Sequence, residues 1–454
     1  MIKTLKSSVA LLVATAGLMT VMSLPATAAT KKISCYQFST TDLKLTTKSV
    51  TTAPCPKGFT QGTPTQAELQ GTNNTGDIDL SVPSSADSLS INGSSFATLL
   101  VNATTSGTSA FPAAKFGSYL GAGSGTGRSG ISGGTLNIGF SDQPMSSTAA
   151  GTLISTSSNA STSAQVDSNF VQVPYLLGGA VVAYNIGAGF DGVKLTAEEI
   201  AKIYNGTITL WSDSAIVATN GGATSGLGKK LTALTGQARN TIKVVYRAKS
   251  SGTTYAFTDY LLTAGAAGVP TGFTAANGAV MEGSGNKWGA TNSVGAQDNA
   301  DMAKTITNTI GSIGYVEYSY ILLPGNDAVQ AALLQDKNGE WLDPNSTQML
   351  TYVANAASAA GDKVTAESNS IVYQTGKNVW PFATYSWAIV AKTQSSAATG
   401  QAVVKYLDWV THYGQVKFAK DNGYVPLPDA AASYARKQLA NVTANGVVLL
   451  NVKN

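Results

Sequence analysis

The sequence predicts an α/β protein, and three observations support this fold class. Strand-like apolar runs alternate with segments of helical spacing from about residue 88 onward. Residues 242–262 show the unit most clearly: a β-branched run ends at Arg247, a small polar turn follows, and apolar residues then recur at helical spacing. A charged fraction of 12% with 47 glycines is typical of a globular chain with many loops and argues against disorder.

The N-terminus has the pattern of a secretory signal peptide. A basic start (Lys3, Lys6) precedes the apolar residues 9–24 and the small residues 26–28. We expect residues 1–29 to be removed on export to the periplasm, the cell surface or the medium. No later run approaches the ~20 apolar residues that cross a bilayer, so we expect no direct membrane insertion.

The mature chain is nearly neutral. Loss of Lys3 and Lys6 changes 29 basic residues to 27, against 25 acidic residues. Bulk attraction to nucleic acid is therefore not expected. About 425 residues remain, which is enough for two or three folding units.

The only cysteines, Cys35 and Cys55, fall in residues 30–62, which we interpret as a small separate module. In an oxidising compartment they are expected to form one disulfide. A reactive thiol or a metal-binding pair is the alternative, but neighbouring residues supply no further ligands. The polar residues 63–85 are interpreted as a linker, and the Ser/Thr-rich residues 146–169 as a surface insertion.

The main body contains a series of strand-to-turn sites. Residues 88–93 precede a Gly/Ser turn, and residues 119–127 (YLGAGSGTG) carry four glycines that let backbone N–H groups approach a ligand. This turn only weakly matches a dinucleotide-binding fingerprint. Another strand runs into Asp142, and residues 195–203 predict a helix with a Thr cap and an acidic first turn.

The turn between Arg247 and the following helix is the strongest candidate anion site. Ser251 and Thr253 suit the first turn of a helix, whose unpaired N–H groups and positive dipole end attract anions. A guanidinium four residues earlier adds a planar, bidentate donor. The alternative is an ordinary capped helix beside a surface arginine.

Taken together, these landmarks resemble the phosphate-binding receptors of bacterial ABC importers, in the periplasmic-binding-protein superfamily. The resemblance extends over residues 88–440, and the 119–127 turn and the triplet 97–99 are most similar to the secreted DING-type branch. It rests on residues 195–211 (LTAEEIAKIYNGTITLW), Arg247 with Ser251-Gly252-Thr253, residues 311–318 (GSIGYVEY), Trp380-Pro381 and residues 423–428 (GYVPLP).

The resemblance implies a two-lobed type II fold whose lobes close over a ligand. Residues 86–176 and 383–454 would form lobe one, and residues 177–382 lobe two. The chain would cross between the lobes near residues 174–179 and 380–383.

The resemblance also implies a phosphate site. Its residues would be Thr98, Leu99, Ser124, Asp142, Arg247, Ser251, Gly252 and Thr253. In an alternative alignment, Ser95 and Phe96 replace Thr98 and Leu99. Asp142 would reject sulfate, because a carboxylate repels an anion that has no proton to donate. Many relatives carry an acid two residues after the arginine, whereas this chain has Lys249.

We expect a binding protein rather than an enzyme, without metal or cofactor. The only histidine, His412, is interpreted as a helix-surface residue, and no Ser-His-acid or metal cluster can be built around it. Tyr315, Tyr318 and Tyr320 are interpreted as packing residues. The expected partners are inorganic phosphate and a membrane-embedded ABC permease. The alternative is a surface-associated protein with a structural, adhesive or envelope-assembly role.

Overall fold

The computed structural model describes residues 33–38, 45–51, 54–57, 60–61, 81–106, 111, 114–145, 169–274, 287–361 and 370–450. The predicted signal peptide, most of the predicted linker and almost all of the Ser/Thr-rich insertion lie outside these residues.

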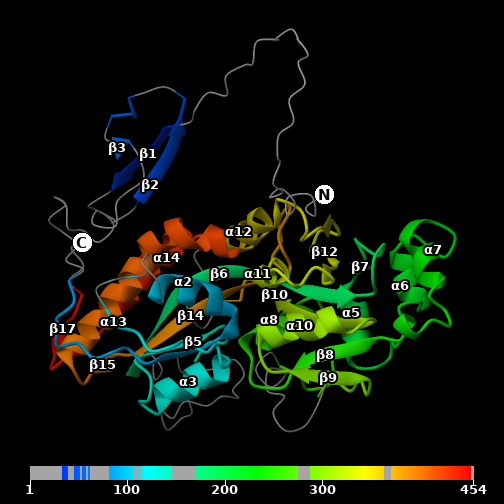
Figure 1. The fold of residues 1–454 in the computed structure, drawn as a ribbon, viewed down its shortest axis with the longest axis horizontal. Helices are drawn as coiled ribbons and strands as arrows, with labels where there is room; N and C mark the ends of the chain where they lie inside the picture. Colours follow the sequence, from blue (N-terminus) through cyan, green and yellow to red (C-terminus); the bar gives the residue numbers. More distant parts are fainter. Residues whose placement is uncertain are drawn as a thin grey trace, which may run out of the picture.

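A small sheet forms the N-terminal module, as the sequence predicted (Figure 1). Its central strand β1 (Ile33–Phe38) pairs antiparallel with β2 (Leu45–Val50) and β3 (Thr60–Gln61). Cys35 and Cys55 form a disulfide, and Cys35 is buried. The expected disulfide is therefore confirmed, and the metal and reactive-thiol alternatives are wrong.

One mixed sheet runs through the main body in the order β4-β5-β14-β6-β10-β8-β9, with β11 also paired to β6. Its strands are β4 (Ile91–Gly93), β5 (Ile138–Ser141), β6 (Phe170–Asn185), β8 (Lys243–Arg247), β9 (Ser293–Ala296), β10 (Ser312–Glu317), β11 (Gln330–Ala331) and β14 (Ala383–Ala391). Strands β4 and β5 are parallel, as are β10, β8 and β9. Antiparallel strands β14 and β6 join these two parallel groups.

Strand β6 connects the two halves of this sheet. Residues 170–179 pair with β14, whereas residues 180–185 pair with β10. The change of partner falls three residues after the predicted boundary at 176/177. The lobe boundaries themselves stay a prediction.

Helices surround both halves (Figure 1). The first half carries α2 (Thr98–Thr105), α3 (Ser124–Ser132), α13 (Ala397–Trp409) and α14 (Asp429–Leu439), together with the short η2 (Ser95–Ala97) and a π-helix (Val410–Ala419). The second half carries α5 (Ala197–Tyr204), α6 (Ser214–Thr219), α7 (Gly226–Thr232), α8 (Gly252–Thr263), α10 (Asn299–Asn308), α11 (Tyr318–Ile321) and α12 (Met349–Ala360). The predicted cap of α5 is present, since Thr196 Oγ1 accepts from Glu199 N at 3.2 Å and Glu199 Oε2 accepts from Thr196 N at 2.8 Å.

Shorter elements complete the main body. They are β7 (Lys194–Leu195), β12 (Leu333–Gln335), β13 (Trp341–Leu342), β15 (Thr393–Gln394), β16 (Thr443–Ala444), β17 (Val447–Val448), η3 (Ala238–Asn240) and η5 (Lys420–Asn422). None of the helices within the described ranges is long and apolar enough to cross a membrane.

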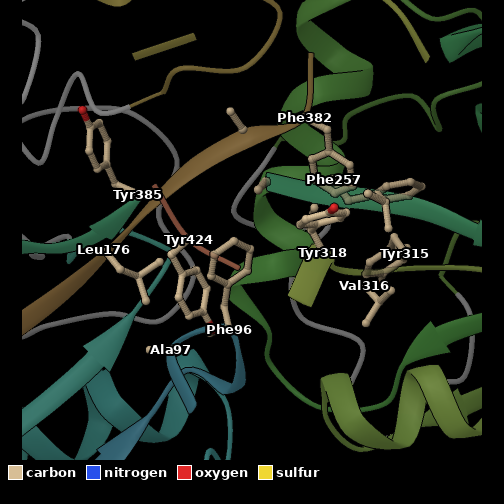
Figure 2. Packing of buried hydrophobic residues seen from close by; sticks show 14 of the residues in the cluster. Phe96, Ala97, Leu176, Phe257, Tyr315, Val316, Tyr318, Phe382, Tyr385 and Tyr424 are labelled. Atoms are coloured by element: carbon tan, nitrogen blue, oxygen red, sulfur yellow. The ribbon is translucent and has the colours of Figure 1, made fainter. Parts of the chain in front are cut away.

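Aromatic side chains fill the region where the two halves meet (Figure 2). Phe257 stacks on Tyr315 with ring centroids 4.3 Å apart, and Phe96 lies 6.3 Å from Tyr424. Gly178 of β6 lies against the Phe96 ring, where an added Cβ would come within 2.7 Å. A glycine at this point lets residues 94–97, here termed the first ligand turn because the sequence predicts ligand contacts there, pack directly on the strand that joins the two halves.

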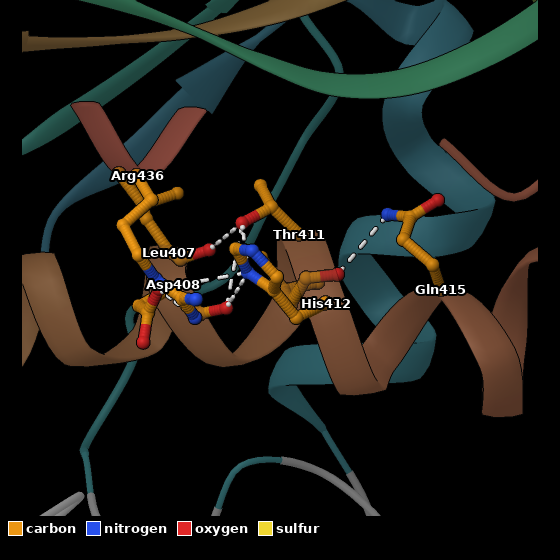
Figure 3. Close-up of polar contacts among 7 residues, drawn as sticks. Leu407, Asp408, Thr411, His412, Gln415 and Arg436 are labelled. Atoms are coloured by element: carbon orange, nitrogen blue, oxygen red, sulfur yellow. Dashed lines mark hydrogen bonds and ion pairs between the residues drawn. The ribbon is translucent and has the colours of Figure 1, made fainter. Parts of the chain in front are cut away.

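The interpretation of His412 as a surface residue is wrong. Its side chain is only 7% exposed, and its Nδ1 lies 2.8 Å from the Asp408 carbonyl oxygen (Figure 3). The Asp408 carboxylate accepts from Arg436 Nε at 2.9 Å, so α13 and α14 are joined by a buried ion pair. Asp408 thus contacts both His412 and Arg436 of α14.

Candidate functional site

The predicted strand-turn-helix around the anion turn is confirmed. Strand β8 ends at Arg247 and helix α8 begins at Gly252. Ser251 caps the helix, because its side chain accepts a hydrogen bond from Thr254 N at 3.2 Å. The first amides of α8 therefore open toward the turn, where the helix dipole favours negative charge.

Arg247 is a buried cation with unused donors. The residue is 1% exposed, and Nη2 donates to the Gln297 carbonyl at 3.2 Å. Its Nε and Nη1 atoms are buried and have no hydrogen-bond partner among the residues that the structure describes. Burial lowers the pKa of Arg247, and the nearby carboxylates of Asp298 and Asp142 act in the opposite direction. Buried guanidinium donors without an acceptor are costly, so this geometry suits an added anion.

Asp142 follows strand β5 and is also buried, with 1% exposure. Ser94 Oγ lies 2.6 and 2.7 Å from its two carboxylate oxygens, and Ser124 Oγ lies 3.4 Å from Oδ2. Burial raises the pKa of Asp142 to about 6, while hydrogen bonds from serine hydroxyls and the Arg247 charge act to lower it. The carboxyl group is therefore ionised in neutral solution.

The two halves of the protein meet at these residues. A Cβ added to Gly252 would come within 2.5 Å of Ser124 Oγ and 2.6 Å of Asp142 Oδ2. A Cβ on Gly123, which has φ +109°, would lie 2.7 Å from the Ser250 carbonyl oxygen. Glycine is needed at both positions for the turns to approach this closely.

The structure thus brings together most of the predicted site residues, namely Ser124, Asp142, Arg247, Ser251, Gly252 and Thr253. Thr98 and Leu99 instead begin helix α2, and the Thr98 hydroxyl packs on Gly121, where a Cβ would come within 2.4 Å. Within the described ranges, no hydrogen bond joins Thr98 or Leu99 to Asp142 or Arg247. Ser94 and Ser95, one turn earlier, make the polar contacts of this segment.

Two features of the site add to the sequence interpretation. Lys249 is exposed to solvent, and the carboxylate that acts on Arg247 from its own half of the protein belongs to Asp298. Tyr315 does more than fill space, because its hydroxyl accepts from Arg247 N at 3.3 Å and lies 2.8 Å from Thr254 Oγ1. It fixes the junction between β8 and α8.

Arg128 is a charged site neighbour that the sequence interpretation missed. It is 4% exposed, lies four residues after Ser124 on the same face of α3, and donates through Nη1 to Ser141 Oγ at 3.2 Å. In the described part of the chain, its Nε and Nη2 atoms have no hydrogen-bond partner. Burial lowers the pKa of Arg128 to about 10, and the Asp142 charge opposes that shift. The i, i+4 spacing from Ser124 is the signal that could have revealed it.

This geometry defines a class of protein: an α/β protein whose two halves, joined through a shared strand, meet around buried charged and polar side chains. The chain belongs to the PBP superfamily, whose domain model matches residues 60–413.

Individual relatives agree with this assignment. The chain is 30% identical to the phosphate-binding protein PstS of Pasteurella multocida over 312 residues, covering 68% of this chain and 78% of that one. It is 28% identical to the phosphate-binding protein PstS of Xylella fastidiosa over 311 residues, covering 68% and 73% of the two chains. The structure shares its fold with the phosphate-binding protein from Stenotrophomonas maltophilia, with TM-score 0.53, 18% identity and coverage of 80% and 96%.

Proposed function

We propose that this protein captures hydrogen phosphate between its two halves and delivers it to a membrane-embedded ABC permease. The observation that carries the proposal is the buried Arg247 guanidinium near the buried Asp142, because its Nε and Nη1 atoms find no hydrogen-bond partner within the described ranges. The phosphate-binding relatives support the same ligand. The proposed role is capture without catalysis, in an exported protein.

The chemistry of the site favours hydrogen phosphate over sulfate. Arg247, the first amides of α8 and the hydroxyl groups of Ser124 and Thr253 supply donors to an oxyanion. Asp142 supplies an acceptor, which only an anion that carries a proton can satisfy. Arsenate shares this protonation behaviour and is the expected competitor.

Calorimetric titration of phosphate-stripped protein tests the proposal. Wild-type protein should bind one phosphate, and Arg247→Met should lose at least about 100-fold in affinity, since it removes a charge-assisted donor group. Arg239→Met is the matched control, because Arg239 lies away from the site and contacts Phe190 and the Ile186 carbonyl. Wild-type protein that gives no heat and no change in melting temperature with phosphate would overturn the proposal.

A further inference from the structure

Asn299 connects the first ligand turn to the anion turn. It is the first residue of α10 and is fully buried. Its Nδ2 donates to Ser95 Oγ at 3.0 Å and to Thr253 Oγ1 at 3.3 Å. Its backbone N–H also donates to Ser95 Oγ at 3.2 Å. One amide thus contacts a hydroxyl group from each half of the protein.

The orientation of the Asn299 amide is determined by its third contact. The Glu317 backbone N–H, which can only donate, lies 3.3 Å from Asn299 Oδ1. The oxygen of the amide therefore faces Glu317, and its two hydrogens face Ser95 and Thr253.

This arrangement determines what the two hydroxyl groups can do. A hydroxyl group has one proton and two acceptor lone pairs. The Ser95 hydroxyl accepts twice from Asn299, which occupies both of its lone pairs, and the Thr253 hydroxyl accepts once, which occupies one of its two. Each proton is left to be donated elsewhere. Ser94 differs, because its hydroxyl already lies within hydrogen-bond distance of both Asp142 oxygens.

We infer that Asn299 is a positioning residue of the anion site, which makes the Ser95 and Thr253 hydroxyl groups donors toward the bound anion. The inference rests on the proposed phosphate function. It assigns Ser95 as the hydroxyl donor from the first ligand turn. The bound anion would also help to hold the two halves together, because it would accept hydrogen bonds from both Ser95 and Thr253 and so complete the network that joins them.

Two substitutions separate this role from a merely structural one. Asn299→Asp keeps the shape but presents only acceptors, so both hydroxyl groups would donate to the new carboxylate, whose charge also repels the anion. Asn299→Ala removes the amide and leaves the hydroxyl groups free to rotate. If Asn299 had only a structural role, Asn299→Asp, which keeps the shape, would lower phosphate affinity less than Asn299→Ala. The inferred role predicts that Asn299→Asp lowers phosphate affinity more than Asn299→Ala.

Asn185→Ala is the matched control. Asn185 is also a buried asparagine that contacts α10, but its Nδ2 donates to the carbonyls of Ile306 and Thr307 near the other end of that helix. Phosphate affinity should fall about tenfold in Asn299→Ala and about 100-fold or more in Asn299→Asp, since each lost donor to a charged group costs about 1.5 to 3 kcal/mol. The control should stay within about twofold of wild type by the same reasoning.

Calorimetry and melting temperatures of ligand-free protein decide the outcome. Wild-type protein that binds no phosphate would refute the proposed function itself. Wild-type binding together with Asn299→Asp equal to wild type, or tighter than Asn299→Ala, would overturn the inference alone. If Asn299→Asp does not fold, the comparison of Asn299→Ala with Asn185→Ala decides, and equal affinities would overturn it.

Discussion

A single methyl group at Gly252 should block closure of the site. In Gly252→Ala the new Cβ would lie 2.5 Å from Ser124 Oγ and 2.6 Å from Asp142 Oδ2, whereas ordinary contact begins at 3.4 Å. The two turns must therefore separate by about 0.8 to 0.9 Å, the difference between these distances. That displacement moves the first amides of α8 away from any anion held by Asp142.

The magnitude follows from the hydrogen bonds that are stretched. Hydrogen bonds to a charged group are worth about 1.5 to 3 kcal/mol each, so loss of one should weaken phosphate binding about 10- to 100-fold. The stability of the ligand-free protein should fall by less than the binding free energy does. Alanine is favoured over glycine in a helix by about 1 kcal/mol, and separation of the turns relieves the clash.

Calorimetry for phosphate and thermal melting without ligand measure the two effects. Gly117→Ala is the control, because its nearest contact would be the Leu89 carbonyl oxygen at 3.5 Å. If Gly252→Ala binds phosphate within twofold of wild type, the close approach of the two turns is not required for binding and the reasoning fails.

Three further predictions concern stability. Burial raises the pKa of Glu317 to about 8 from an ordinary 4.5, so its stabilising contribution is complete below about pH 4.5 and is lost as the pH rises through 8, at about 1.4 kcal/mol per pH unit. Urea unfolding of ligand-free protein should therefore give a lower free energy of unfolding at pH 8 than at pH 5, and Glu317→Gln should reduce this difference. An equal difference in the variant would contradict the prediction. Asp408→Asn breaks the buried ion pair with Arg436, so it should lower the free energy of unfolding by about 3 to 5 kcal/mol without changing phosphate affinity. An unchanged melting temperature would argue against a stabilising role for that pair. Replacing Cys35 and Cys55 by serine removes a cross-link over 20 residues that contributes about 3 kcal/mol to the stability of the N-terminal module. Proteolysis within residues 33–61 should accelerate, while phosphate affinity measured by calorimetry should not change. Weakened phosphate binding would instead link the module to the site.

Local patterns predicted much of this structure. The β8–α8 turn was predictable because a β-branched run, a serine cap and helical spacing all lie within about twenty residues. The disulfide was predictable because the two cysteines lie in one short segment that follows a predicted signal peptide, and an oxidising compartment favours their pairing. Ser124, Asp142 and Gly252 meet as expected because each ends or begins an element at the same junction of the sheet.

Other features depend on contacts between distant segments. The relative positions of Ser95 and Thr98 depend on where η2 ends and α2 begins, and both residues suit a helix start equally well in sequence. Asn299 follows the capping residue Asp298 and has no distinguishing local pattern. His412 lies in an amphipathic segment, but its side chain lies against Asp408, which pairs with Arg436 from a helix further along the chain. Burial by a distant element leaves no periodic signal.

The most direct test of the account is the selectivity of Asp142→Asn for phosphate and sulfate, measured by calorimetry near pH 7.5. Wild-type protein should bind phosphate and give no response to sulfate, because the ionised carboxylate faces the anion. The variant should bind sulfate as well, because its amide can donate to an unprotonated oxygen. Sulfate binding by wild-type protein, or continued exclusion of sulfate by the variant, would contradict the assignment of Asp142 and the phosphate site built around it.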